Sequence, residues 1–192
     1  MATASNDDAI DDGLNRLRRQ VIADTDVPVA LREALAAGAA LEEIRLDAAG
    51  RWWHQGERFS HPRLIALFSR SLVCTARGTW LVQVEPYSYP VAVDDVGFFV
   101  TGARPDGDGW LLRLSDGSEE RLDPATLRSD GDTWLGCLVH AGHDEARIVD
   151  GAWIGLAEAI DDGDEGGWRL RRGADSWPIG ARAPFRRCAL PE

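Results

Sequence analysis

The fold is decided by two segments, IRLDAAGRWWHQGERFSHPRLIALFSRSL (residues 44–72) and GTWLVQVEPYSYPVAVDDVGFFV (residues 78–100). Alternating apolar and polar residues on both sides of Ala48-Ala49-Gly50 predict a β-hairpin. Pro62 stands where the first turn of a helix tolerates proline, and Ser60 is a candidate N-cap, so the apolar stripe that follows predicts a helix over residues 62–73. The second segment predicts short antiparallel strands, and the fold class is therefore α+β.

The regions outside these segments follow the same alternation of helix and strand patterns. Residues 1–43 predict an N-terminal helical arm, with short helices at 11–22 and 29–41 broken at Pro28. Turn residues separate the remaining predicted strands. The other predicted elements are strands at 80–84, 89–93, 98–101, 102–104, 110–114, 134–139, 168–171 and 177–179, a helix at 144–160 and an irregular tail at 184–192.

The two halves of the chain can be aligned with each other. Arg63-Leu64-Ile65 matches Arg147-Ile148-Val149 at an offset of 84 residues, and both runs are predicted to begin a helix. Trp80 matches Trp168, and Pro90 matches Pro178, at an offset of 88 residues, with the difference assigned to an acidic loop at 161–167. We therefore expect two related helix-plus-antiparallel-sheet subdomains, 44–103 and 104–183, produced by duplication.

Composition excludes several classes of function. The formal net charge is −11, so a general nucleic-acid polymer is disfavoured as a partner, since phosphate-backbone binding needs clustered cations. The basic residues are all Arg, which excludes Schiff-base and P-loop lysines. Cys74, Cys137 and Cys188 are few and widely spaced, which favours reduced thiols. No apolar stretch approaches the roughly 18 residues that span a bilayer, so we expect no membrane span and a cytoplasmic location.

Residues 44–100 carry a family resemblance. Gly50, Trp52 and Gly56 precede a helix with the Leu64 to Phe68 pattern, and Pro86, Val93 to Asp95 and Phe98 follow it. With these features the chain resembles the bacterial family known as domain of unknown function 1285, and residues 147–177 match it more loosely. The chain departs from the family pattern after Pro86, where Tyr87-Ser88-Tyr89 replaces an acidic residue.

The resemblance implies two related subdomains, of which the C-terminal one is similar to pleckstrin-homology folds. It also implies a cleft between them that holds a nucleotide-like ligand, and a role in signal transduction. No enzymatic activity and no cofactor are implied.

Six residues are candidate ligand contacts. Arg63 and Arg147 are chosen because a guanidinium at a helix start strengthens anion binding, although a structural salt bridge is an equally good interpretation. Trp53 offers a stacking surface, and His54 a ring nitrogen, although a half-packed hairpin histidine is the simpler interpretation. The full candidate set is Trp53, His54, Arg63, Tyr87, Asp95 and Arg147.

The sequence gives only weak indications of metal binding or catalysis. Cys137, His140 and His143 have side chains that suit Zn²⁺, but residues three apart on a strand point to opposite faces, so a structural cysteine beside two loop histidines is favoured. Asp161 to Glu165 lacks the spacing of a calcium loop. No motif of a nucleophile with a base is present, so no catalytic residue is assigned.

These observations leave three hypotheses about the function, which are given in order of preference. The first is a non-catalytic regulatory protein that binds a nucleotide-like anion between its subdomains. The second is a protein–protein adaptor that uses the pleckstrin-like half. The third is a metal-dependent enzyme.

Overall fold

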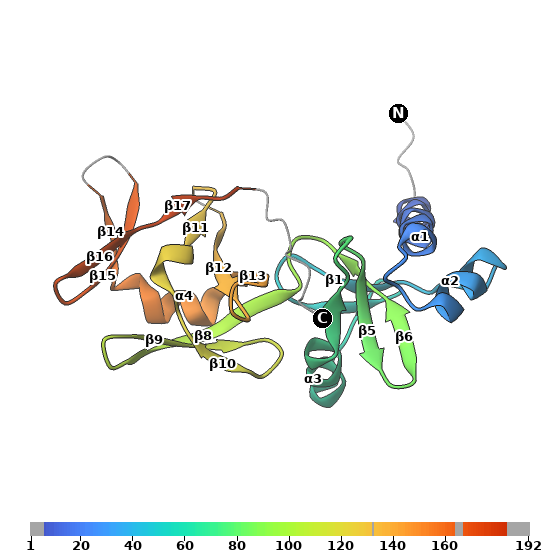
Figure 1. Ribbon diagram of the computed structural model, residues 1–192, viewed down its shortest axis with the longest axis horizontal. Helices are drawn as coiled ribbons and strands as arrows, with labels where there is room; N and C mark the ends of the chain where they lie inside the picture. The colour runs from blue at the N-terminus through green and yellow to red at the C-terminus, as the bar shows by residue number, and fades with distance from the viewer. Residues whose placement is uncertain (1–5, 132, 164–166, 184–192) are drawn as a thin grey trace. The chain divides into compact units, whose positions relative to one another are not determined.

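The computed structural model describes residues 6–131, 133–163 and 167–183, which form two compact units, Met1–Gly97 and Phe98–Glu192 (Figure 1). The predicted boundary at residue 103 lies inside a strand, β8 (Phe98–Asp106), whereas the division between the units falls at the start of this strand. The predicted tail at 184–192 lies outside the described residues. Helices and several sheets are both present, so the α+β class is confirmed.

The N-terminal helices pack on the first unit. Helix α1 (Asn6–Ala23) and helix α2 (Val29–Ala36) share a hydrophobic core with strand β5 (Trp80–Val84) through Leu81. The buried Asp24 carboxylate accepts hydrogen bonds from the Thr75 hydroxyl at 2.6 Å and the Asp26 amide at 2.9 Å. Burial acts to raise the pKa of Asp24, but these hydrogen bonds outweigh it and the pKa lies below its ordinary value. The N-terminal arm is therefore part of the first unit.

Two sheets and helix α3 (Pro62–Arg70) complete the first unit. The predicted hairpin is confirmed, and Asp47 closes its turn by accepting from the Ala49 and Arg51 amides, each at 2.9 Å. The four-stranded sheet has the order β3-β2-β1-β7, with β7 parallel to β1, and the other sheet has the order β4-β5-β6. The strand bounds are β1 Ile44–Leu46, β2 Trp52–His54, β3 Glu57–Arg58, β4 Leu72–Cys74, β6 Tyr87–Pro90 and β7 Ala92–Val93.

Helix α3 begins at Pro62 as predicted, but its N-cap and its end differ from the prediction. Its N-cap is His61, not Ser60, because the residue before Pro62 is restricted to extended backbone, and no side chain caps this end. The helix ends at Arg70, where the chain turns at Ser71 into β4. The predicted last turn, residues 71–73, is therefore wrong.

The second unit contains a mixed seven-stranded sheet of order β10-β9-β8-β13-β12-β11-β17 and a three-stranded sheet of order β14-β15-β16. Its parallel pairs are β13 with β8 and β11 with β17. The predicted strands at 98–101 and 102–104 form one strand, β8, with an irregular register between Val100 and Gly102. The other bounds are β9 Gly109–Leu114, β10 Glu119–Arg121, β11 Arg128–Ser129, β12 Leu135–Val139, β13 Asp144–Ile148, β14 Ile160–Asp162, β15 Trp168–Arg172, β16 Asp175–Pro178 and β17 Gly180–Ala181, with a 3₁₀ helix at Pro124–Thr126.

The predicted helix at 144–160 is wrong over its first residues. Residues 144–148 form β13, which pairs with β12 on one side and β8 on the other, and helix α4 (Asp150–Ala157) begins only afterwards. Ala146 and Ile148 alternate into the core, so pairing with neighbouring strands outweighs the helix propensity of this run. Arg147 therefore lies on a strand and not at a helix start.

Two glycines allow α4 to lie directly on β8 (Figure 1). A Cβ at Gly155 would lie 2.0 Å from the Ala103 carbonyl oxygen, and one at Gly151 would lie 2.8 Å from the Thr101 carbonyl oxygen. Backbone atoms cannot yield as a flexible side chain does. The helix position therefore requires glycine at these two sites.

Helix α3 with β4–β6, and helix α4 with β14–β16, have the same element order. Equivalent positions are 88 residues apart throughout: Pro62 and Asp150 begin the helices, Trp80 and Trp168 begin the middle strands, and Pro90 and Pro178 lie in the last strands. The registers agree as well, since Leu81 pairs with Pro90 and Arg169 with Pro178. The predicted offset of 84 residues for the helices, and the longer loop invoked to explain it, are wrong. The residue equivalent to Arg63 is Gly151.

The Gly155→Ala substitution is expected to destabilise the second unit, because the added methyl group must displace the Ala103 backbone. We expect the free energy of unfolding to fall by about 3 kcal/mol, measured by urea denaturation with tryptophan fluorescence. The control is Gly13→Ala in α1, where no atom lies within 4 Å of the new Cβ. This control should stabilise the protein by about 0.5–1 kcal/mol. An unchanged unfolding midpoint for Gly155→Ala would contradict the close contact.

Candidate functional site

A hollow of about 220 Å³ lies in the first unit, where β2, β3 and the start of α3 meet. We call it the β3–α3 hollow. Its lining contains one guanidinium, one carboxylate, two imidazoles and one hydroxyl, together with a phenyl ring and an aliphatic side chain. The lining residues are His54, Glu57, Arg58, Phe59, Ser60, His61 and Leu64.

Aromatic packing positions these residues. Trp52 is buried, and its indole N–H donates to the Ser69 hydroxyl of α3 at 3.0 Å. The Phe68 ring meets both the Trp52 and the Phe59 rings edge-on, each with ring centroids 5.4 Å apart. Phe59 in turn contacts the His54 ring. This chain of rings joins the hairpin to the helix and fixes the wall of the hollow.

Arg58 is the cationic side chain in the lining, and Arg63 lies beside the hollow on α3. The Arg58 and Arg63 side chains form no ion pair with any residue in the described ranges 6–131, 133–163 and 167–183. The N-terminal end of α3 has no side-chain cap. His54 is engaged, since its Nε2 atom lies 3.0 Å from the Glu42 carboxylate, and Glu57 adds a second carboxylate nearby. The arrangement can attract an anion, but it does not pair a base with a nucleophile.

Two of the six predicted contacts lie at this hollow or beside it. His54 lines it, and Arg63 is the second residue of α3. Trp53 is next to His54, but its indole N–H donates to the Asp47 carboxylate at 2.9 Å. The other predicted contacts lie elsewhere.

Tyr87 begins β6 and is 77% exposed, and Asp95 follows β7 and is half-buried. Arg147 lies in the second unit, where its guanidinium donates to the Thr133 carbonyl oxygen at 2.8 Å. The structure therefore does not gather the six residues within one unit. Sequence reasoning missed Arg58 and His61, which flank the turn before α3 and belong to no recognised motif.

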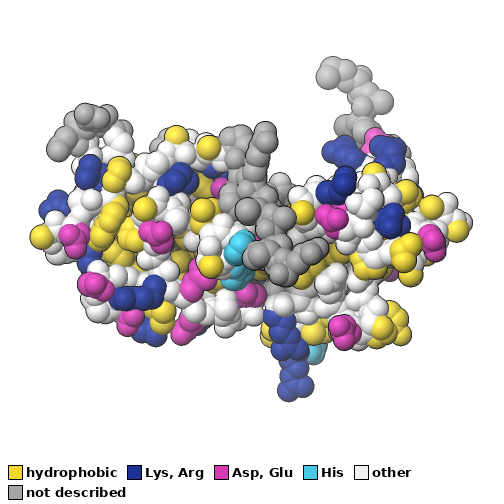
Figure 2. Space-filling view, in the orientation of Figure 1, with side chains coloured by type: hydrophobic (Ala, Val, Ile, Leu, Met, Phe, Trp, Pro, Cys, Tyr) yellow, Lys and Arg dark blue, Asp and Glu magenta, His cyan; other side chains and the backbone are white. Residues whose placement is uncertain are grey.

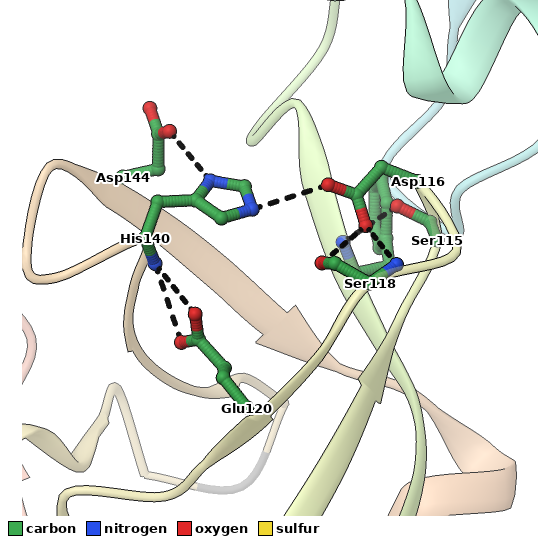
Figure 3. Close-up of polar contacts among 7 residues, drawn as sticks. Ser115, Asp116, Ser118, Glu120, His140 and Asp144 are labelled. Carbon is green, nitrogen blue, oxygen red and sulfur yellow. Dashed lines mark hydrogen bonds and ion pairs between the residues drawn. The ribbon is translucent and has the colours of Figure 1, made fainter.

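A second polar cluster surrounds His140 in the second unit (Figure 3). Its Nδ1 atom lies 2.8 Å from the Asp144 carboxylate, and its Nε2 atom lies 3.1 Å from the Asp116 carboxylate. Cys137 points into the core, where burial raises the pKa of its thiol to about 12 and neighbouring carboxylates add to the effect. Cys137, His140 and His143 do not come together as metal ligands, and no metal-binding group of three or more such side chains occurs among the described residues.

Known proteins resemble this chain in structure rather than in sequence. No protein-family model matches it, and no curated protein matches it. A crystal structure of a DUF1285 family protein from Silicibacter pomeroyi DSS-3 is similar, with a TM-score of 0.55 and 19% identity over 73% of this chain and 81% of that chain. The chain has a DUF1285-like fold.

A second DUF1285 family protein, from Shewanella baltica OS155, has a TM-score of 0.47 and 16% identity over 61% of this chain and 91% of that chain. The DUF1285 resemblance inferred from residues 44–100 is confirmed for the fold by the Silicibacter pomeroyi structure. At such low identity the similarity establishes the fold alone, and the site must be argued from this chain's own residues. No helix in the described part of the chain has the length and apolar character needed to cross a membrane.

The Cys137 thiol is expected to resist alkylation in the native protein at mildly alkaline pH, because the thiolate is the reactive form and burial disfavours it. In a Cys188→Ser background, mass spectrometry after iodoacetamide treatment should find Cys137 unmodified until denaturant is added. The half-buried Cys74 is the control and should react first. Modification of Cys137 at the rate of Cys74 would contradict its burial.

Proposed function

We propose that this protein is a non-catalytic binding protein that takes a small anion, or the phosphate group of a nucleotide-like ligand, into the β3–α3 hollow. The observation that carries the proposal is the meeting of Arg58, two imidazoles and the uncapped start of α3 at one concave surface. A helix start and a guanidinium each favour negative charge, and here they act together.

The charge balance of the chain supports an anion at this place. Acidic residues outnumber basic ones by 32 to 21, so most arginines have carboxylates available as partners. Arg58 and Arg63 nevertheless form no ion pair with a described residue, although Glu57 is adjacent to Arg58 in sequence. Cations left without a protein partner are available to a ligand.

The size of the hollow limits the ligand. A volume of about 220 Å³ is smaller than the roughly 300–1,000 Å³ of pockets that enclose a drug-sized molecule. A phosphate or small carboxylate fits, whereas a nucleotide would leave its base outside. Glu57 and Glu42 oppose a highly charged anion, so we expect modest affinity.

Non-catalytic action is part of the proposal. His54 is paired with Glu42, and no serine, threonine or cysteine hydrogen-bonds to it among the described residues. A signalling role and a cytoplasmic location, both expected from the sequence, also belong to the proposal. Under this proposal, binding of the ligand to the first unit would be the event that carries the signal.

Replacing Arg58 with Gln should weaken binding of inorganic phosphate about tenfold, because a charge-assisted hydrogen bond is lost. Binding is measured by ¹H–¹⁵N chemical-shift titration at fixed ionic strength, and the shifts should localise to residues 57–64. Arg70→Gln, in the last turn of the same helix, is the matched control and should bind as the parent does. Adenosine monophosphate tests the nucleotide-like class. Equal weakening by both variants, or no saturable shift, would refute the proposal.

An adaptor function is the second proposal, and exposed apolar residues on α4 support it. Ile154 is 75% exposed and Trp153 is 37% exposed, and Figure 2 shows hydrophobic side chains at the surface of the second unit. Isolated exposed residues are ordinary, but an exposed large aliphatic residue and a partly exposed indole at consecutive positions of one helix favour contact with another protein. The pleckstrin-like character of this unit remains part of this proposal.

The Ile154→Asp substitution separates the two proposals. Under the adaptor proposal, this substitution should abolish the recovery of a protein that remains bound to the parent protein through purification. The anion-binding proposal predicts that the variant's affinity for phosphate is unchanged. Both measurements are made on the same variant. Ile160 is not suitable for this test, because its side chain is half-buried and a charge there would disturb the fold. Unchanged recovery of every partner would contradict the adaptor proposal.

We also propose that the α3 motif and the α4 motif arose by duplication. The constant spacing of 88 residues and the matching registers support this proposal. The two copies have since diverged at the helix start, where Arg63 faces solvent and Gly151 touches the β8 backbone. Under this proposal, only the first copy retains a cationic helix start.

A further inference from the structure

The His140 side chain joins two turns that are distant in sequence (Figure 3). One is the β12–β13 turn, residues 140–143, in which His140 has a φ of 52° and Ala141 a φ of 56°. The other is the β9–β10 turn, residues 115–118, which contains Asp116. A left-handed backbone is uncommon for residues other than glycine, and this turn contains two such residues in succession. The ring thus lies between Asp144 and Asp116.

The Asp116 carboxylate and the backbone of His140 are each held by further hydrogen bonds. The other oxygen of Asp116 accepts from the Ser118 amide at 2.9 Å and from the Ser118 hydroxyl at 2.7 Å. The Glu120 carboxylate accepts from the His140 backbone N–H at 3.0 Å. The Phe98 ring, from the first residue of β8, stands edge-on to the imidazole with centroids 4.6 Å apart. The ring is therefore packed as well as hydrogen-bonded.

Both contacts of the ring require a proton on each nitrogen. A neutral imidazole has one N–H donor and one lone pair, and a lone pair cannot bind a carboxylate oxygen. With the ring protonated, Nδ1 donates to Asp144 and Nε2 donates to Asp116. With the ring neutral, only one of the two carboxylates keeps its donor.

We propose that His140 is a proton-operated catch that holds the β9–β10 turn to the β12–β13 turn, and that loss of the ring proton releases the β9–β10 turn. The shorter contact joins the β12–β13 turn to Asp144, the first residue of β13, and keeps the remaining N–H. The longer contact, to Asp116, is the one that is lost. Ser115, next to Asp116, donates its backbone N–H to the Phe99 carbonyl oxygen, and its hydroxyl accepts from the Phe99 amide at 3.1 Å, so the release reaches the first residues of β8.

The charged groups that face His140 set the direction of the pH response. The hydrogen bond with Asp144 is the largest influence and raises the pKa of His140; burial acts against it, and the charges of Asp144, Asp116 and Glu120 add to the rise. His143 lies in the same turn, with its Nδ1 atom buried and without a hydrogen-bond partner. Because the folded-state pKa is raised, the catch is fully engaged below the unfolded value near 6.5. It is lost as pH rises through the folded-state pKa.

An NMR titration of the full chain tests the first step. Long-range ¹H–¹⁵N spectra of the four histidine rings should give His140 a pKa above about 6.5, and Asp116→Asn should lower it. Each ring is assigned by substitution, and His54, which pairs with Glu42 in the other unit, is the control whose titration Asp116→Asn should leave unchanged. A His140 pKa at or below the ordinary value overturns the proposal.

Hydrogen exchange tests the release itself. After correction for the intrinsic pH dependence, the Ser118 and Phe99 amides of the parent should exchange roughly threefold to tenfold faster above the His140 pKa, the range that one net hydrogen bond stabilises. In His140→Gln, which cannot titrate, this change should vanish, whereas in His143→Gln it should persist. Amide exchange in the parent that does not change across the His140 titration overturns the proposal, even if His140→Gln fails to fold.

Discussion

The buried indole of Trp52 is the contact on which the first unit depends. It lies on β2, packs edge-on against Phe68 and hydrogen-bonds to Ser69, so one side chain binds the hairpin to helix α3 both by apolar contact and by a polar bond. A buried indole N–H without an acceptor would be costly, and Ser69, itself buried in α3, supplies that acceptor. The β3–α3 hollow exists because this junction fixes the end of the hairpin beside the start of the helix.

In the second unit, small residues rather than one large residue join the helix to a sheet. Gly151 and Gly155 bring α4 onto the β8 backbone, and Ala152 and Leu156 are fully buried beside them. The two motifs thus share an element order and a register but differ in how the helix meets the rest of its unit. The start of α4 is occupied by its contact with β8, so the anion site that we propose is placed at α3 alone.

Sequence patterns predicted the parts of the fold that local chemistry controls. Turn residues and apolar periodicity act over a few positions. They therefore predicted the hairpin around Ala48 to Gly50, the start of α3 at Pro62 and the strands that begin with Trp. Residues 144–148 were misassigned as helix because their composition favours a helix, while their partners, β8 and β12, are known only from the fold.

The candidate site was less predictable from the sequence than the fold was. His140 was considered as a metal ligand with Cys137, since nothing local indicates Asp116, 24 residues away. Of the hollow, His54 was identified, but Arg58 and His61 carry no motif.

The parallel pairing of β7 with β1 has a consequence for how the chain is made. Residues 92 and 93 complete the sheet begun at residue 44, so the first unit has all of its strands once residue 93 has left the ribosome. The second unit is different, because β17, at Gly180–Ala181, supplies an outer strand of its sheet long after the first strand of that sheet, β8, has been made. Assembly of the nascent chain is therefore expected to be sequential, with the amino-terminal unit closing while the other still lacks an edge.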